Sequence, residues 1–101
     1  HITGGGLTEN LPRVLPDDLG AAVDLSTIPN LPIMAWLSEA GSISQDEMLK
    51  TFNCGIGMIL AVEPTQASAI ESELLAYAMA PVRIGEVTKG HGVHYSGKLP
   101  F

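Results

Sequence analysis

The second half of the chain constrains the fold most, because it predicts two strands with a helix between them. Residues 57–63 form an apolar run that stops at Pro64, which is typical of a strand buried on both faces. Residues 65–79 carry apolar side chains at helical spacing, and Pro81 closes that helix. Residues 82–88 predict a second strand. Two strands joined by a helix of about four turns form a crossover unit, so we expect the strands to be parallel.

The first half of the chain predicts shorter elements. Apolar residues at helical spacing begin at Leu7, and Pro12 predicts a break or a new start of that helix near Leu11, because proline lacks the N–H that a helix interior uses. Residues 21–25 predict a short buried strand. A further helix is expected to begin at an Asn30 cap.

The strongest local helix signal is a capping box, with Ser44 as the N-cap and Glu47 three residues later. Near the C-terminus, a tight turn at residues 90–92 leads into a short strand at residues 93–96, which predicts a terminal hairpin. Trp36 is expected to lie in the core. Together these elements predict an α/β fold with α+β character, in which helices cover a mixed sheet.

Charge and composition exclude several classes of partner. The net charge is −6, from 11 acidic and 5 basic residues, and the basic residues are scattered singly. A nucleic-acid surface needs clustered Lys and Arg, so we expect no nucleic-acid partner. No stretch approaches the roughly 20 uninterrupted apolar residues that span a bilayer, so we expect no membrane partner. Cys54 is the only cysteine, and a reducing, cytoplasmic location fits best.

The run Thr3-Gly4-Gly5-Gly6 lies just before a predicted helix. Glycines allow the backbone to take positive φ and to approach a ligand closely, and a helix N-terminus offers unpaired N–H groups to a phosphate. The Thr3 hydroxyl and the His1 ring would add donors. The run matches neither a Walker A motif nor a dinucleotide fingerprint. From the pattern alone, the loop is either a phosphate cradle or simply a tight turn.

Other polar residues carry weaker signals. Cys54 is interpreted as a small buried thiol and not as a nucleophile, because free cysteines are usually buried and inert. The Asn53 amide would order the adjacent loop or touch a ligand. His91 and His94 lack a third ligand at a recognisable spacing, so no metal site is predicted.

Four short motifs occur in a characteristic order along the chain. They are HITGGGL at residues 1–7, ENLPRVLP at residues 9–16, TFNCGIGM at residues 51–58 and IGEV at residues 84–87. In this order they resemble the phosphoribosylformylglycinamidine cyclo-ligase family, that is, aminoimidazole ribonucleotide (AIR) synthetase. The resemblance covers the chain up to Tyr95.

The resemblance implies an enzyme of purine biosynthesis. Members of this family use ATP to close formylglycinamidine ribonucleotide to aminoimidazole ribonucleotide, with release of ADP and phosphate. They combine an N-terminal domain, which holds the nucleotide and its Mg²⁺, with a C-terminal α/β domain that completes the cleft. Residues 1–101 resemble the later part of that C-terminal domain. The first strands of the domain and the whole N-terminal domain have no counterpart here.

The resemblance also suggests which residues form the site. The glycine loop would hold a phosphate of a small phosphorylated substrate or of the nucleotide, and the motif histidine would donate to the reacting amide as a catalytic residue. Two asparagines match motif positions without an assigned contact. These residues are His1, Thr3, Gly4, Gly5, Gly6, Asn10 and Asn53.

Two alternatives remain. Formylglycinamidine ribonucleotide synthetase, selenophosphate synthetase and thiamine-phosphate kinase share the two-domain plan, although HITGGG followed by ENLPRVLP favours AIR synthetase. The other alternative is a non-catalytic α/β interaction module with a structural glycine turn. Because the leading strands are absent, sheet edges would be left uncovered, so we also expect a homo-oligomer.

The ATP-binding lysine and the acidic Mg²⁺ ligands implied by the family have no counterpart in residues 1–101. We therefore predict that this chain alone does not turn over, because only half of the site is present. The measurement is ADP release from the isolated chain with ATP, Mg²⁺ and substrate. Detectable, substrate-dependent ADP release would contradict the prediction.

Overall fold

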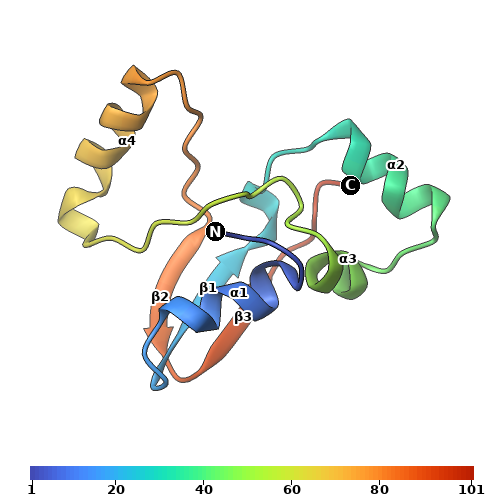
Figure 1. Cartoon of the computed structure of the whole chain (residues 1–101), viewed down its shortest axis with the longest axis horizontal. Coiled ribbons are helices and arrows are strands. Elements are labelled where there is room, and N and C mark those ends of the chain that lie inside the picture. The colour runs from blue at the N-terminus through green and yellow to red at the C-terminus, as the bar shows by residue number, and fades with distance from the viewer.

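The computed structural model describes all residues from 1 to 101, and a three-stranded mixed sheet forms the lower part of the molecule in Figure 1. β1 (Leu19–Asp24) is the middle strand. It pairs antiparallel with β2 (Gly85–Lys89) and parallel with β3 (Gly92–Ser96). The mixed sheet confirms the predicted α/β fold with α+β character.

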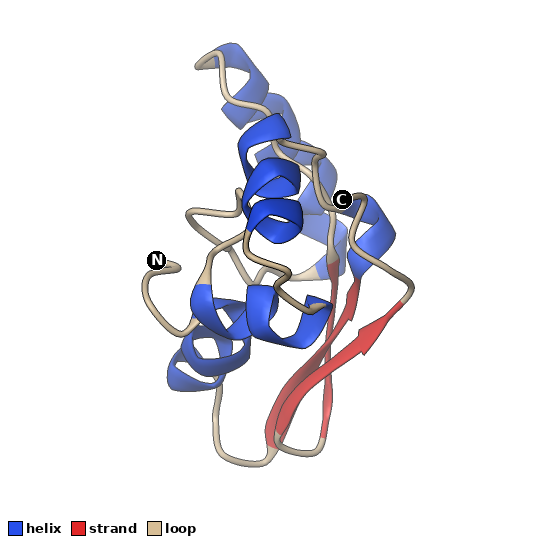
Figure 2. Cartoon of the chain, turned by 90° about the vertical axis from the view of Figure 1, so that its right-hand side faces the viewer, coloured by secondary structure: helices blue, strands red, loops and turns tan.

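Four α-helices and two 3₁₀ turns complete the fold. The α-helices are α1 (Gly6–Val14), α2 (Pro32–Ala40), α3 (Gln45–Thr51) and α4 (Ala67–Ala76), and the turns are η1 (Leu25–Thr27) and η2 (Pro64–Gln66). α1 packs against α3, β1 and β3. Figure 2 shows that the helices do not cover the whole sheet, since several of them lie beyond the upper end of the strands. None of the helices has the length and apolar character that crossing a bilayer requires.

The core lies between the sheet and the α1–α3 pair. Leu25 and Met48 are fully buried at its centre. The buried apolar side chains form one cluster, as expected for a single small domain. Its members are Ile2, Leu7, Leu11, Ala21, Val23, Leu25, Ile28, Met48, Leu49, Cys54 and Leu99.

The capping-box helix begins where the sequence predicts. The Ser44 hydroxyl accepts a hydrogen bond from the Glu47 backbone N–H at 3.3 Å. Met48, at the next position, is buried, so the cap fixes the start of the helix that carries the central core residue.

Three local predictions in the first half are wrong. α1 continues through Pro12 without a break, because proline removes only one backbone donor while Leu7 and Leu11 anchor the helix in the core. α2 takes Leu31 and not Asn30 as its N-cap, with Pro32 in the first helical position that its fixed φ suits. Trp36 is 62% exposed and does not lie in the core.

The predicted crossover unit is also wrong. Residues 57–63 form no strand, although α4 confirms a helix between them and β2. β2 is antiparallel to β1, so no parallel pair flanks α4. A strand needs a neighbour to supply its hydrogen bonds, and the backbone of residues 58–62 forms none with the rest of the chain. The apolar run alone could not reveal that.

The prediction of a terminal hairpin is wrong for a different reason. β2 and β3 follow one another in the chain, yet β1 lies between them and neither pairs with the other. Gly20 makes this insertion possible, because a Cβ there would collide with the backbone oxygens of Gly90 and Gly92. The Gly90 N–H also donates to the Asp18 carbonyl oxygen at 2.8 Å, which fastens the connection to the start of β1.

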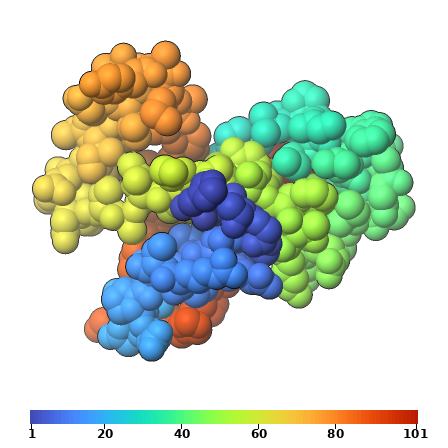
Figure 3. All heavy atoms as spheres, viewed as in Figure 1, coloured from blue at the N-terminus to red at the C-terminus, as the bar shows by residue number.

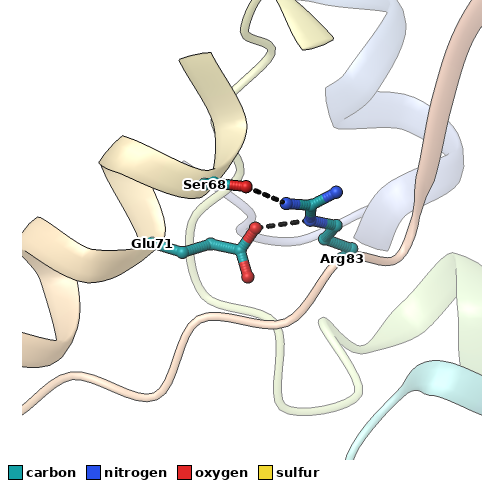
Figure 4. A network of polar contacts seen from close by, with 3 residues as sticks. All are labelled: Ser68, Glu71 and Arg83. Atoms are coloured by element: carbon teal, nitrogen blue, oxygen red, sulfur yellow. Dashed lines mark hydrogen bonds and ion pairs between the residues drawn. The ribbon is translucent and has the colours of Figure 1, made fainter. Parts of the chain in front are cut away.

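α4 lies away from the core and is held by polar contacts (Figure 4). The Arg83 guanidinium forms an ion pair with Glu71 and donates a hydrogen bond to the Ser68 hydroxyl at 3.2 Å. The guanidinium is largely exposed, so we assign the pair no more than about 1 kcal/mol. Contacts with the rest of the chain therefore contribute little to the stability of α4.

Candidate functional site

The glycine loop forms a tight turn at the start of α1. The Gly6 N–H donates to the Thr3 carbonyl oxygen at 3.1 Å, which closes the turn. Gly5 is the N-cap of α1 with φ of 94°, a left-handed conformation that glycine adopts without strain. The predicted loop-to-helix transition is therefore present.

Asn10 holds the loop from inside the fold. This side chain, on the second turn of α1, is buried, and its Nδ2 donates to the carbonyl oxygens of Thr3, Gly4 and Gly6 at 3.3, 3.2 and 2.8 Å. Its Oδ1 accepts from the Thr3 hydroxyl at 3.4 Å and from Arg13 Nη1 at 3.2 Å. One carboxamide thus fixes the direction of three backbone carbonyl groups where the loop enters α1.

The clamp leaves two backbone donors free. In a trans peptide the N–H points opposite to the preceding C=O, and every peptide bond here is trans. Because Asn10 draws the Thr3 and Gly4 carbonyls inward, the N–H groups of Gly4 and Gly5 point away from it. Neither N–H has a hydrogen-bond partner in the chain. The loop therefore presents two adjacent donors at a helix N-terminus.

The three glycines have different surroundings. A Cβ on Gly6 would collide with the backbone oxygens of Leu49 and Phe52, so Gly6 allows α1 to approach α3. A Cβ on Gly5 would collide with the Glu9 side chain, which lies against the loop. A Cβ on Gly4 would meet no atom within 4 Å. Only Gly4 faces open space.

The first and third sequence motifs lie side by side. The Ile2 N–H donates to the Gly57 carbonyl oxygen at 2.9 Å, and Gly6 packs on the backbone of Leu49 and Phe52 at the end of α3. Asn53, in that same segment, accepts a hydrogen bond from the Gly55 N–H at 2.8 Å through its Oδ1. Asn53 therefore orders the turn around Cys54. Its side chain forms no hydrogen bond with the glycine loop.

The remaining candidates are placed as follows. His1 is exposed and its ring makes no hydrogen bond, although the next residue, Ile2, is buried and anchored. Cys54 is buried, its Sγ donates to the Met48 carbonyl oxygen at 3.5 Å, and burial raises the pKa of its thiol to about 11. A thiol with this pKa stays protonated near neutral pH, so the geometry favours packing over nucleophilic attack.

No group of three His, Cys, Asp or Glu side chains is arranged to hold a metal ion. His91 and His94 are exposed around the β2–β3 turn.

Sequence reasoning missed two contacts. It assigned no contact to Asn10, and it did not place the Thr8 hydroxyl 2.8 Å from the Tyr95 hydroxyl, a bond that ties α1 to β3. The signal for the first was present: Asn10 is three residues after Leu7, on the buried face of the helix, where a polar side chain requires partners. The second links residues far apart in sequence, and no local pattern predicts it.

Comparison with known proteins defines the class. Residues 1–97 match the family described as "AIR synthase related protein, C-terminal domain". The chain belongs to this family, as its motifs indicate.

One relative of known name shows how much of a longer protein the chain resembles. The chain is 50% identical over 92 residues to a phosphoribosylformylglycinamidine cyclo-ligase of Xanthomonas oryzae pv. oryzae (strain PXO99A). The match covers 91% of this chain and 27% of the relative, so the chain spans about a quarter of the relative's length.

The different surroundings of the glycines predict different costs of substitution. Gly6→Ala should lower the free energy of unfolding by at least about 2 kcal/mol, because it forces a Cβ into backbone atoms at a positive φ. Gly4→Ala should change it by no more than about 0.5 kcal/mol. Urea denaturation of both variants measures the difference. Equal stabilities would contradict the assigned packing role of Gly6.

Proposed function

We propose that this chain is the phosphate-holding part of an ATP-dependent cyclo-ligase that closes formylglycinamidine ribonucleotide to aminoimidazole ribonucleotide. Membership of the AIR synthase related family supports the proposal, as does 50% identity to a relative named phosphoribosylformylglycinamidine cyclo-ligase. The observation that carries it is the pair of free N–H groups on Gly4 and Gly5.

The two donors suit an anion for electrostatic reasons. They lie at the N-terminus of α1, where the helix dipole favours negative charge, and adjacent N–H groups that point the same way form an anion-binding nest. Gly4 faces open space, so a phosphate oxygen can approach its backbone directly. The loop thus offers a phosphate of a small substrate two charge-assisted hydrogen bonds.

The same loop limits affinity for phosphate alone. The Glu9 carboxylate lies against Gly5, and the chain carries a net charge of −6. The carboxylate and the net negative charge both oppose the binding of a free anion, although solvent screens the effect of the net charge. We therefore expect weak binding of inorganic phosphate alone, with the rest of the ligand supplying the remaining binding free energy.

His1 is proposed to donate a hydrogen bond to the reacting amide. Its ring is free of other partners, and the bonded backbone of Ile2 fixes the position from which it extends. Thr3 is proposed as a further phosphate contact if its hydroxyl turns from Asn10, since that bond is long at 3.4 Å.

ATP and Mg²⁺ are assigned to parts of a longer polypeptide. The acidic side chains present here form no metal-binding group, so no step through Mg²⁺ is derived for these residues. We propose that an N-terminal domain supplies the nucleotide site and is the partner that completes the cleft. A cytoplasmic location belongs to the same proposal, since the one cysteine is a free thiol.

A non-catalytic interaction module is the second candidate. The packing of Gly6 against α3 favours it, because this gives the glycine run a structural role without any ligand. The two functions differ in what the outer part of the loop does. A ligand-binding loop uses Gly4, whereas a structural turn has no use for its open face.

Phosphate titration of the ¹⁵N-labelled chain tests the proposal. Inorganic phosphate should shift the amide resonances of Gly4 and Gly5, and Gly4→Ala should weaken binding several-fold, because its methyl group occupies the open face. Gly57→Ala is the matched control, since its Cβ also meets no atom within 4 Å but lies outside the loop. Absence of shifts in the loop, or equal weakening by both variants, would favour the interaction module.

A further inference from the structure

The Glu9 side chain folds back over the glycine loop. Its Cβ and Cδ lie 2.8 and 2.9 Å from the position that a Cβ on Gly5 would occupy, and one carboxylate oxygen lies closer still. That position is about 2.5 Å from the backbone nitrogen of the same residue, so the carboxylate lies within about 5 Å of the Gly5 nitrogen. Glu9 is therefore a direct neighbour of one of the two donors proposed to bind phosphate.

Two features of α1 keep the Glu9 carboxylate at the loop. Glu9 lies in the first turn of the helix, where the helix dipole favours negative charge. Arg13, four residues later, has the spacing and the order that favour a helical ion pair with Glu9. Its guanidinium donates instead to Asn10 Oδ1 at 3.2 Å, and no ion pair joins Arg13 to Glu9. The clamp that shapes the loop thus also occupies the cation that would draw Glu9 away from it.

The position of this carboxylate affects which anions the loop can hold. Figure 3 shows the N-terminal residues, in dark blue, on the surface that faces the viewer, so a ligand can reach them. A phosphate held by the Gly5 N–H lies close enough to Glu9 that salt, with a screening length of roughly 8 Å, does not remove their repulsion. A carboxylate accepts about four hydrogen bonds and donates none. A donor group beside the phosphate would therefore turn the opposing contact into a favourable one.

We propose that Glu9 is a specificity-determining residue of the glycine loop. It accepts a hydrogen bond from a hydroxyl or N–H group that the ligand carries close to its phosphate, and it disfavours anions that lack such a donor. The ligand class is a small phosphate ester with a neighbouring donor, and inorganic and simple alkyl phosphates are selected against. The inference rests on the proposed function, because it requires a phosphate at Gly4 and Gly5.

Two ligands with the same three-carbon skeleton test the selection. Glycerol 3-phosphate carries hydroxyl groups beside its phosphate, whereas propyl phosphate carries none. Each is titrated into the ¹⁵N-labelled chain and followed at the Gly4 and Gly5 amides, with EDTA present so that no cation bridges the two anionic groups. We expect glycerol 3-phosphate to bind at least about threefold more tightly, because the carboxylate strengthens the hydrogen bond that it accepts.

Replacement of Glu9 separates selection from stabilisation of the helix. Glu9→Met removes the charge and the acceptors but keeps an unbranched side chain. It should strengthen the binding of propyl phosphate and bring the ratio of the two dissociation constants close to one. Glu73→Met makes the same change at an exposed position of α4 and should keep the wild-type ratio. If Glu9 served only the helix dipole, Glu9→Met would lower the Tm and leave the ratio unchanged.

The outcomes distinguish this inference from the proposed function. Shifts at Gly4 and Gly5 with equal affinity for the two ligands, or a ratio that Glu9→Met does not change, would overturn the role of Glu9 and leave the phosphate loop standing. Absence of loop shifts with both ligands would overturn the phosphate loop and the role of Glu9 together.

Discussion

The buried carboxamide of Asn10 is the interaction on which the N-terminal half of the structure depends. A glycine run has no side chains of its own to define its path, and its conformational freedom costs more to restrict than that of any other residue. Asn10 supplies the missing definition by donating to three carbonyl oxygens of the loop and accepting from Thr3 and Arg13. The loop, the start of α1 and the basic residue at its end are thereby held as one unit.

This clamp has consequences for packing and for chemistry. With the carbonyls turned inward, Gly6 can lie against the backbone that ends α3, while the N–H groups of Gly4 and Gly5 are left facing outward without partners. The inner part of the loop therefore builds the fold, and the outer part is free for a ligand. A structural turn and the proposed phosphate cradle are compatible, because Gly6 packs against α3 whereas the donors proposed to bind phosphate belong to Gly4 and Gly5.

Local patterns predicted what local interactions decide. The Ser44 cap, the α4 helix and the burial of Cys54 follow from neighbours along the chain, and the ordered motifs predicted the family. The predictions that failed concern elements whose structure depends on residues far apart in the sequence. The insertion of β1 between β2 and β3 rests on contacts of Gly20 with the β2–β3 turn, and residues 57–63 lack a strand because the backbone of residues 58–62 forms no hydrogen bonds with the rest of the chain. For the site, the glycine loop was predictable, whereas the geometry that frees its donors required the position of Asn10.

Replacement of Asn10 by aspartate tests the clamp most directly. Asn10→Asp keeps the size of the side chain but faces three carbonyl oxygens with a carboxylate, so we expect a loss of about 3 kcal/mol in unfolding free energy and altered amide shifts at Gly4 and Gly5. Asn53→Asp adds the same charge yet keeps the acceptor for the Gly55 N–H, so it should cost no more than about 0.5 kcal/mol. Equal stability of the two variants, with unchanged loop shifts, would contradict the account.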